Sequence, residues 1–584
     1  MNEHRPLYLF TCLCLWLASH GQSLANALQQ EYVTITPAYA DGVLFIASAE
    51  NLSHRGHLRA IDILNAFPLV LWDAAEHMPQ AGTGRTQPES ILPDNTFRTI
   101  FTNLNEILLP LEAGQAEHLQ PVLGSASVAE AEILLHTVRG RRGGTPELAA
   151  GTTEDRQRLW GISRSSPVLV GSSPVDKESR QRPRVLYAGA EDGMLHAFFV
   201  SHWDDDTGNY PSDDPDGGIE LWAYLPGSFL PHLAEQPLDS TPGQIAIHLD
   251  GTPVVGERFV DFDGDGQRDW RTLLVATGTI LQRRCSCLFV MDVTDPYRPE
   301  LLWEMQLPGS GVGRTRGVSL GRCENETSDC LYLTADFAPQ TGAVGMHALA
   351  VSLADGQLLW QFSAPYAASG PVAEATPAVP ALMDRDGDGH HDTLVFGDLA
   401  GQLWALDLGD GQAYSNGPVF TVPGGIDEPI GASVAVQGKV VVFGTGGVTG
   451  TSDLFQYALY AVNVSAGGSS LLWRYPLQPG EKVWAAPVVD AFGNVIFATA
   501  TGYLPLAQTN EQATTGRLVV IDKEGVELSR RETAAATVGQ VVASPGIIVS
   551  VDMKSEVTQF GTASRMTGPD EDRGSVRILS WRPL

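Results

Sequence analysis

Short runs of alternating apolar and polar positions recur along most of this chain, with a period of two residues rather than 3.6. One run reads like "GQLWALD" (401–407), and from residue 286 onward its copies start 56 to 59 residues apart. Each copy follows an apolar run such as "TLVFGDL" and often precedes a run with a tryptophan, such as "LLWQF". A further run, such as "TPAVPAL", comes before them. The repeat unit is therefore four short strands.

Four short strands per repeat predict an all-β fold, a quinoprotein-like β-propeller of about seven four-stranded blades. Seven copies lie between residues 160 and 584, which we assign to the propeller, and an eighth lies at 56–62. The last copy, "GSVRILS" (574–580), is followed by only four residues, so the last blade lacks an outer strand of its own. Residues 26–75 then either complete that blade and close the ring, or form an additional hairpin.

Two segments break the repeat. Residues 76–159 contain turn-rich polar sequence and then "VAEAEILLHTVRG", whose apolar spacing is helical, so we predict a polar and helical insertion. Residues 201–218 are rich in aspartate, and we expect a solvated loop there rather than a metal site. The tryptophans of the repeat are expected to fill the core between neighbouring sheets, with the indole N–H bonded to backbone. They are Trp72, Trp222, Trp303, Trp360 and Trp473.

The chain carries a formal net charge of −31, and this excludes nucleic-acid binding, which needs a cationic surface. The first 25 residues predict a secretory signal peptide, with Arg5, the apolar core "LYLFTCLCLWLA" and small residues before Ala25. A membrane anchor is the alternative, but this apolar core is too short to span a bilayer. We therefore expect an exported protein without an integral membrane span.

Four cysteines remain after removal of the signal peptide: Cys285, Cys287, Cys323 and Cys330. An even number in an oxidising compartment favours one or two disulfides, with the pairing left open. A zinc site is the alternative, but neither a CxxC pair nor a nearby histidine cluster supports it.

The stretch "DRDGDGHHD" (384–392) has the spacing of a calcium loop. Its aspartates stand at positions 1, 3, 5 and 9, and position 7 usually supplies a backbone carbonyl. Val395 stands where an EF-hand has its bidentate glutamate, and the flanking runs are strands, so we predict a calcium loop in a β-hairpin. An acidic turn without metal and a transition-metal site using the histidines are the alternatives; the surrounding oxygens favour calcium. The predicted ligands are Asp384, Asp386, Asp388, His390 and Asp392.

A second stretch with the same spacing, "DFDGDGQRD" (261–269), falls at the same place in its own blade. Both loops connect the first and second strands, where another blade has only the short turn "VQGK". The position in the blade is therefore the recurring feature. The predicted ligands of the second loop are Asp261, Asp263, Asp265, Gln267 and Asp269.

The order of these motifs resembles the carboxy-terminal propeller of the PilC/PilY family of type IV pilus biogenesis and tip proteins. The resemblance covers roughly residues 40 to 560. Its matching stretches include "SSPVLVG" (165–171), "YAGAEDGMLHAFF" (187–199), "ELWAYLPGSFLPHL" (220–233), "DGTPVVGERF" (250–259), "MDVTDP" (291–296) and "DRDGDGHHDTLVFGDLAGQLWALDL" (384–408).

The resemblance implies that the loop at 384–392 binds calcium and that the metal state regulates pilus extension and retraction. It also implies pilus components, such as minor pilins, or a cell-surface molecule as partners. The expected location is the periplasm, the outer membrane or the surface of a Gram-negative-type bacterium. Family members usually carry a large amino-terminal region before the propeller, which we do not expect in this mature chain.

We expect a non-catalytic role in pilus assembly, pilus stability or retraction, or tip-associated adhesion. A quinone-dependent dehydrogenase is one alternative, because such enzymes use calcium and tryptophan-rich propellers. A periplasmic scaffold for outer-membrane assembly is another. The sequence contains no defensible catalytic triad or paired carboxylates. His196 in "GMLHAFF" is the best single candidate for catalysis, and we expect it to be a satisfied core residue instead.

Overall fold

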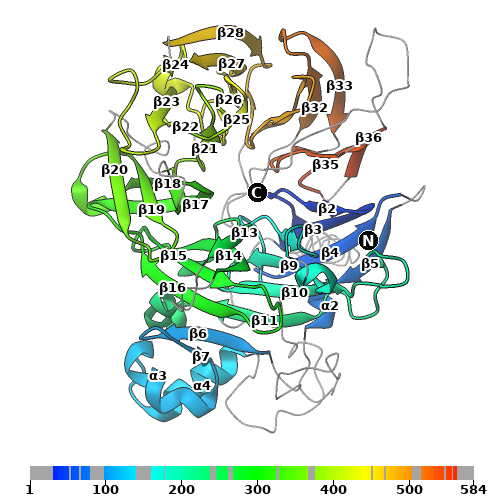
Figure 1. Ribbon diagram of the computed structural model, residues 1–584, viewed down its shortest axis with the longest axis vertical. Helices are drawn as coiled ribbons and strands as arrows, with labels where there is room; N and C mark the ends of the chain where they lie inside the picture. Colours follow the sequence, from blue (N-terminus) through cyan, green and yellow to red (C-terminus); the bar gives the residue numbers. More distant parts are fainter. Residues whose placement is uncertain are drawn as a thin grey trace, which may run out of the picture.

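The chain folds into successive antiparallel sheets that follow one another around a ring, as a computed structural model shows (Figure 1). The predicted β-propeller is confirmed. Eight sheets lie in the described part of the chain, and seven of them have four or more strands. The structure describes residues 31–50, 54–64, 68–78, 98–139, 159–176, 178–236, 245–260, 268–323, 328–365, 375–448, 451–465, 468–502, 515–533, 535–544, 547–554 and 557–561. The predicted signal peptide (1–25) and the repeat copy at 574–580 lie outside these residues.

The first three sheets come from residues 31–306. The first contains β1 (Glu31–Tyr32), β2 (Ala38–Ala40), β3 (Val43–Glu50), β4 (Gly56–Asp62) and β5 (Leu69–Asp73). The second contains β6 (Ile100–Leu104), β7 (Ile107–Pro110), β8 (Val168–Val170), β9 (Arg184–Gly189), β10 (Leu195–Ser201) and β11 (Glu220–Leu225). The third contains β12 (Ile247–His248), β13 (Val254–Val260), β14 (Asp269–Ile280), β15 (Cys285–Asp292) and β16 (Glu300–Gln306).

The fourth to sixth sheets have four strands each. The fourth contains β17 (Val312–Arg322), β18 (Asp329–Phe337), β19 (Gly345–Ser352) and β20 (Leu358–Pro365). The fifth contains β21 (Ala381–Met383), β22 (Thr393–Gly397), β23 (Gln402–Asp407) and β24 (Phe420–Thr421). The sixth contains β25 (Ala435–Gln437), β26 (Val440–Gly444), β27 (Ala458–Ser465) and β28 (Gly468–Pro476).

The last two sheets and a few helices complete the described chain. The seventh sheet contains β29 (Glu481–Lys482), β30 (Val488–Val489), β31 (Val495–Thr501), β32 (Gly516–Ile521) and β33 (Glu527–Thr533), and the eighth β34 (Val542–Ser544), β35 (Ile547–Val551) and β36 (Val557–Gly561). The α-helices are α2 (Ala74–His77), α3 (Ala116–Leu123) and α4 (Val128–Val138). The 3₁₀ helices are η1 (Ala113–Gln115), η3 (Glu178–Gln181), η4 (Gly227–Glu235), η5 (Pro339–Thr341) and η7 (Gly425–Asp427). No helix of these residues is both long and apolar enough to cross a bilayer.

Four of the five predicted tryptophans join their sheet to the next through the indole N–H, whereas Trp72 packs with its ring centre 5.9 Å from that of Phe45. The indole Nε1 atoms of these four donate hydrogen bonds of 2.7 or 2.8 Å to backbone carbonyls of the following sheet. A glycine with positive φ lies against several of these rings; at Gly411, with φ +71°, a Cβ would come within 2.5 Å of Trp360. The donors and acceptors are Trp222 to Pro296, Trp303 to Leu353, Trp360 to Leu408 and Trp473 to Lys523.

The two ends of the described chain close the ring. The N–H of Val33 donates to the carbonyl of Met553 at 3.2 Å, and the N–H of Gln540 donates to Thr36 Oγ1 at 2.9 Å. Apolar side chains of the first and eighth sheets, among them Leu44 and Val549, share one core cluster. The amino-terminal strands therefore form a sheet of their own beside the last one. Seven further sheets follow the first in the described chain, and six of them contain one repeat copy each, while the seventh copy lies outside the described residues.

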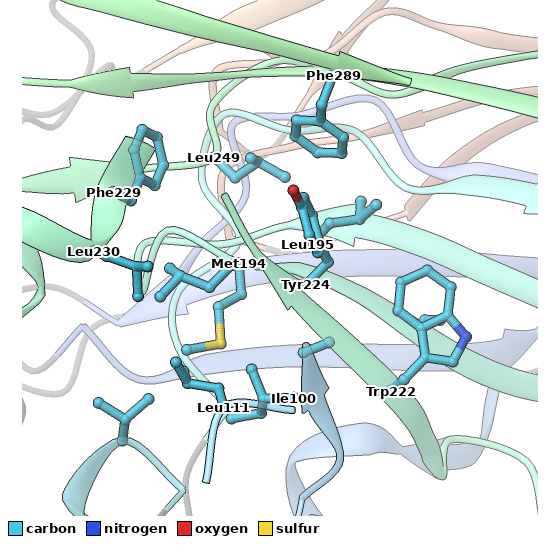
Figure 2. Packing of buried hydrophobic residues seen from close by; sticks show 14 of the residues in the cluster. Ile100, Leu111, Met194, Leu195, Trp222, Tyr224, Phe229, Leu230, Leu249 and Phe289 are labelled. Carbon is cyan, nitrogen blue, oxygen red and sulfur yellow. The ribbon is translucent and has the colours of Figure 1, made fainter. Parts of the chain in front are cut away.

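The insertion contributes strands as well as the predicted helix. Helix α4 begins at Ser127, whose hydroxyl accepts the N–H of Glu130, and it covers the segment with helical spacing. Strand β6 pairs in parallel with β11, the outer strand of the second sheet, and so covers its edge. Figure 2 shows Ile100 and Leu111 of the insertion packed beside Met194, from the loop before β10. The insertion and the second sheet thus share one hydrophobic core.

The cysteines and the aspartate-rich loop at 201–218 were also subjects of predictions. Cys323 and Cys330 form a disulfide across the β17–β18 hairpin, whereas Cys285 and Cys287 are free thiols. In the loop at 201–218 the aspartates accept hydrogen bonds from neighbouring turns, for example Asp204 from the N–H of Asp206 at 2.9 Å. This loop contains no metal-ligand cluster among the described residues.

Replacing Trp360 by phenylalanine tests the link between sheets. The variant keeps an aromatic ring but leaves the buried carbonyl of Leu408 without its donor, and we expect a loss of about 1–3 kcal/mol of stability. Thermal unfolding followed by circular dichroism measures the change. Trp270→Phe is the matched control, because Trp270 is 37 % exposed and its ring lies against Phe259 of its own sheet. Equal melting temperatures for both variants would refute the role of the bond.

Candidate metal centre

Three aspartates converge in the loop that joins β21 to β22. One carboxylate oxygen from each of Asp384, Asp386 and Asp388 lies within 4.8 Å of the other two. Asp384 is half-buried, and the other two are exposed. In the part of the chain that the structure describes, this is the one group of three or more acidic, histidine or cysteine side chains close enough to share a metal ion.

The loop is shaped by its own aspartates. Asp384 accepts hydrogen bonds from the N–H groups of Gly387 at 2.6 Å and Gly389 at 2.9 Å, and these lower the pKa of its carboxyl. Asp386 and Asp388 each accept the N–H two residues further on, at 3.0 and 2.8 Å. The two glycines have φ of +91° and +98°, a region that other residues avoid. Backbone geometry thus holds the three carboxylates close together.

Asp392 and His390 are not part of this cluster. Asp392 lies at the stem of the loop, where its Oδ1 accepts the N–H of Arg385 at 3.0 Å and the hydroxyl of Thr393 at 2.6 Å. The guanidinium of Arg385 lies 3.4 Å from the ring centre of Tyr414, and the hydroxyl of Tyr414 donates to the carbonyl of Asp392 at 3.2 Å. The side chain of His390 is exposed. The sequence spacing therefore identified three converging carboxylates and one residue that closes the stem.

The donor set fits a hard divalent cation. Close carboxylates repel one another, and a cation among them removes that repulsion. Calcium accepts six to eight oxygen ligands from carboxylates, carbonyls and water, so three aspartates on an exposed loop leave room for water. Calcium bound there by Asp384, Asp386 and Asp388 would supply positive charge that fixes the loop. The loop also contacts the next sheet, since Lys439 Nζ donates to the carbonyl of Asp386 at 3.5 Å.

Of the second predicted calcium loop (261–269), the structure describes only the last two residues. Asp261, Asp263, Asp265 and Gln267 lie outside the described residues. Asp269 opens β14 and is exposed, with its Oδ2 3.9 Å from Nη2 of Arg271. The assignment of this loop remains a prediction from spacing.

His196 belongs to a buried group of four charged side chains. Its Nδ1 lies 2.7 Å from Glu220 Oε1, and its Nε2 lies 3.2 Å from Asp192 Oδ1. Arg98, from the insertion, donates two hydrogen bonds to the carboxylate of Glu220, at 2.7 and 2.8 Å. Each of the four side chains is at most 5 % exposed. His196 is therefore a partnered core residue, as expected.

The buried group of Arg98, His196, Asp192 and Glu220 contains equal numbers of positive and negative side chains. Burial opposes protonation of His196, but Asp192 and Glu220 outweigh it and raise the pKa of His196 to about 9. Burial likewise opposes ionisation of Glu220, but Arg98 and His196 lower its pKa to about 2. Two cations and two anions thus connect the insertion to β10 and β11 at neutral pH.

Sequence reasoning missed the partners of His196. Glu220 opens the tryptophan-bearing run "ELWAYL", and Arg98 stands in the irregular insertion, so neither belongs to a repeat motif. The signal that could have found Glu220 is a carboxylate at the start of an otherwise apolar strand, opposite a strand that carries a histidine. No local signal points to Arg98.

No protein-family model matches the chain. Curated relatives do. "Type IV pilus biogenesis factor PilY1 homolog" of Xylella fastidiosa (strain Temecula1) is 27 % identical over 365 residues, which cover 57 % of this chain and 26 % of that protein. "Type IV pilus biogenesis factor PilY1" of Pseudomonas aeruginosa (strain PAO1) is 28 % identical over 285 residues, which cover 44 % of this chain and 21 % of that protein. The chain is similar to PilY1 proteins.

The similarity to PilY1 confirms the resemblance that the motifs indicated. The chain spans about a quarter or less of the length of the PilY1 proteins it matches. Solved structures are more distant. A quinohemoprotein alcohol dehydrogenase from Comamonas testosteroni aligns with 90 % of this chain and 71 % of that chain, at 11 % identity and a TM-score of 0.44. The designed protein Ika8 aligns with 91 % of this chain and 96 % of that chain, at 11 % identity and a TM-score of 0.41. Neither supports an argument about function.

The buried charges predict a pH dependence for this PilY1-like propeller. Because the folded state raises the pKa of His196 above its usual value near 6.5, the stabilisation is complete below pH 6.5 and is lost as the pH rises through about 9. We expect the melting temperature of the protein to exceed that of His196→Gln most at pH 6, and the difference to shrink by pH 9.5. His202→Gln, at an exposed histidine, is the control. A difference independent of pH would show that folded His196 is uncharged.

Proposed function

We propose that this PilY1-like chain is an exported, calcium-binding propeller that acts without catalysis in type IV pilus assembly, pilus stability or retraction, or tip-associated adhesion. Its partners in this proposal are pilus components, such as minor pilins, or a cell-surface molecule. The observation that carries the proposal is the convergence of Asp384, Asp386 and Asp388 in a chain similar to PilY1.

Calcium would act on the shape of the propeller surface. The loop projects between two short paired strands, and β21 has only three residues. Without a cation, repulsion among the three carboxylates opposes the closed conformation of the loop. With calcium, the loop would be fixed, and its carbonyl contact with Lys439 would connect the fifth and sixth sheets. A surface that depends on calcium in this way can make partner binding depend on calcium as well.

Calcium binding is tested by calorimetry on the purified protein. We expect Asp384→Asn combined with Asp388→Asn to lose one calcium site, because two of three converging carboxylates lose their charge. Asp410→Asn is the control, since Asp410 lies in an exposed turn of the same sheet and caps only the N–H of Gln412. Unchanged stoichiometry in the double variant would refute the assignment of this loop.

The cellular role is tested in the source bacterium. We expect a strain with the same double substitution to show reduced surface pili or reduced twitching motility, and an Asp410→Asn strain to behave like the parent. Normal pili and normal motility, with the variant protein present at its usual level, would refute the pilus role. Quinone absorbance with dye-linked alcohol oxidation by the purified protein would refute the non-catalytic role.

A further inference from the structure

The innermost strands of several sheets face the centre of the ring, where Figure 1 shows β13, β17, β21 and β25. Hydrogen bonds connect the segments that lead into them. Ser165 Oγ donates to the carbonyl of Gly251, and the N–H of Ser166 donates to Thr252 Oγ1, both at 3.0 Å. A Cβ on Gly317 would lie 3.8 Å from the carbonyl of Thr252. Residues 163–166, 250–252 and 315–317 are therefore neighbours.

Two arginines stand on these segments. The side chains of Arg164 and Arg316 are exposed, although both lie where sheets converge. Arg316 reaches past the fifth sheet, and its Nη1 donates to the carbonyl of Gly431, before β25, at 3.2 Å. Neither arginine forms an ion pair with any described residue. Two guanidinium groups without carboxylate partners are unusual in a chain with a net charge of −31.

The surroundings carry an excess of positive charge. Arg316 is open to solvent, but desolvation by the sheets around it and the charge of Arg164 lower its pKa to about 10, against the opposing effect of Asp250. Arg314, close by, shares the single carboxylate of Asp336 with Arg284, and both guanidinium groups lie 2.9 Å from its Oδ2. The charge of Arg164 therefore disfavours that of Arg316 in the free protein. An added anion would offset this repulsion.

A buried polar atom without a partner lies in the same region. The Nε2 atom of His248 has no hydrogen-bond partner among the described residues, and the side chain is 2 % exposed. His248 is two residues before Asp250, and burial lowers its pKa, with Arg164 contributing. The imidazole is thus neutral at pH 7 and retains an unused hydrogen-bonding position.

We propose that Arg164 and Arg316 bind the anionic group, a carboxylate or a phosphate, of a small molecule that enters the centre of the ring. Guanidinium groups suit this role, because their planar arrangement of N–H donors matches both oxyanions. Arg164 precedes β8 of the second sheet and Arg316 lies on β17 of the fourth, whereas the aspartate loop belongs to the fifth. The proposal therefore uses residues other than those of the aspartate loop.

The test uses the purified full chain, with inorganic phosphate, succinate and citrate as probes and sodium chloride at matched ionic strength as the reference. Calorimetry and thermal unfolding give the affinity and the shift in melting temperature. We expect at least one probe to bind saturably. A carboxylate ligand is indicated if only succinate or citrate binds, and a phosphate ligand if only phosphate binds. Absence of saturable binding by all three would overturn the proposal.

The variants locate the site. We expect Arg164→Gln to weaken binding at least ten-fold while the protein stays folded, because Arg164 has no hydrogen bond to a described residue. Arg316→Gln should weaken binding similarly. Arg530→Gln, on the outer strand β33, should bind like the unaltered protein. If Arg164→Gln binds as tightly as the unaltered protein, the proposal is wrong.

Discussion

The hydrogen bond from a tryptophan of one sheet to a backbone carbonyl of the next fixes the spacing of the ring. Trp222, Trp303, Trp360 and Trp473 each make this bond from the outer strand of their sheet. The indole ring of tryptophan is large and flat enough to fill the space between two sheets, and its single N–H can donate to only one acceptor. Each bond therefore sets both the distance and the register of neighbouring sheets, and the positions of the inner segments follow from it.

The aspartate loop and the two central arginines lie at positions that do not take part in the tryptophan contacts between sheets. The aspartate loop is a lengthened turn between two strands, so its side chains vary without disturbing the pairing of β21 with β22. Of the two central arginines, Arg164 precedes β8 and Arg316 lies within β17, where hydrogen bonds connect neighbouring segments. In both places the paired strands hold the segment, and exposed charged side chains extend from it.

The sequence predicted those features that depend on local spacing. Alternation with a period of two and the regular repeat predicted the propeller, because each hairpin is encoded within one repeat. The spacing of Asp384, Asp386 and Asp388 likewise predicted their convergence, since one loop determines it. The sequence could not predict the parallel pairing of β6 with β11, or the contact of Arg98 with Glu220, because their partners are distant in sequence. The pairing of Cys323 with Cys330 depended on the register of one hairpin, which residue types alone do not specify.

The buried charges also constrain how this protein can change over evolutionary time. Arg98 is part of the insertion, whereas Glu220, His196 and Asp192 belong to the sheet. Loss of the insertion alone would leave two buried carboxylates facing one histidine, and an uncompensated buried charge costs about 3–5 kcal/mol. The insertion can therefore be lost only together with a compensating substitution in the sheet. Such a coupling makes its acquisition hard to reverse, so the insertion persists as a fixed part of the second sheet whether or not it has a function of its own.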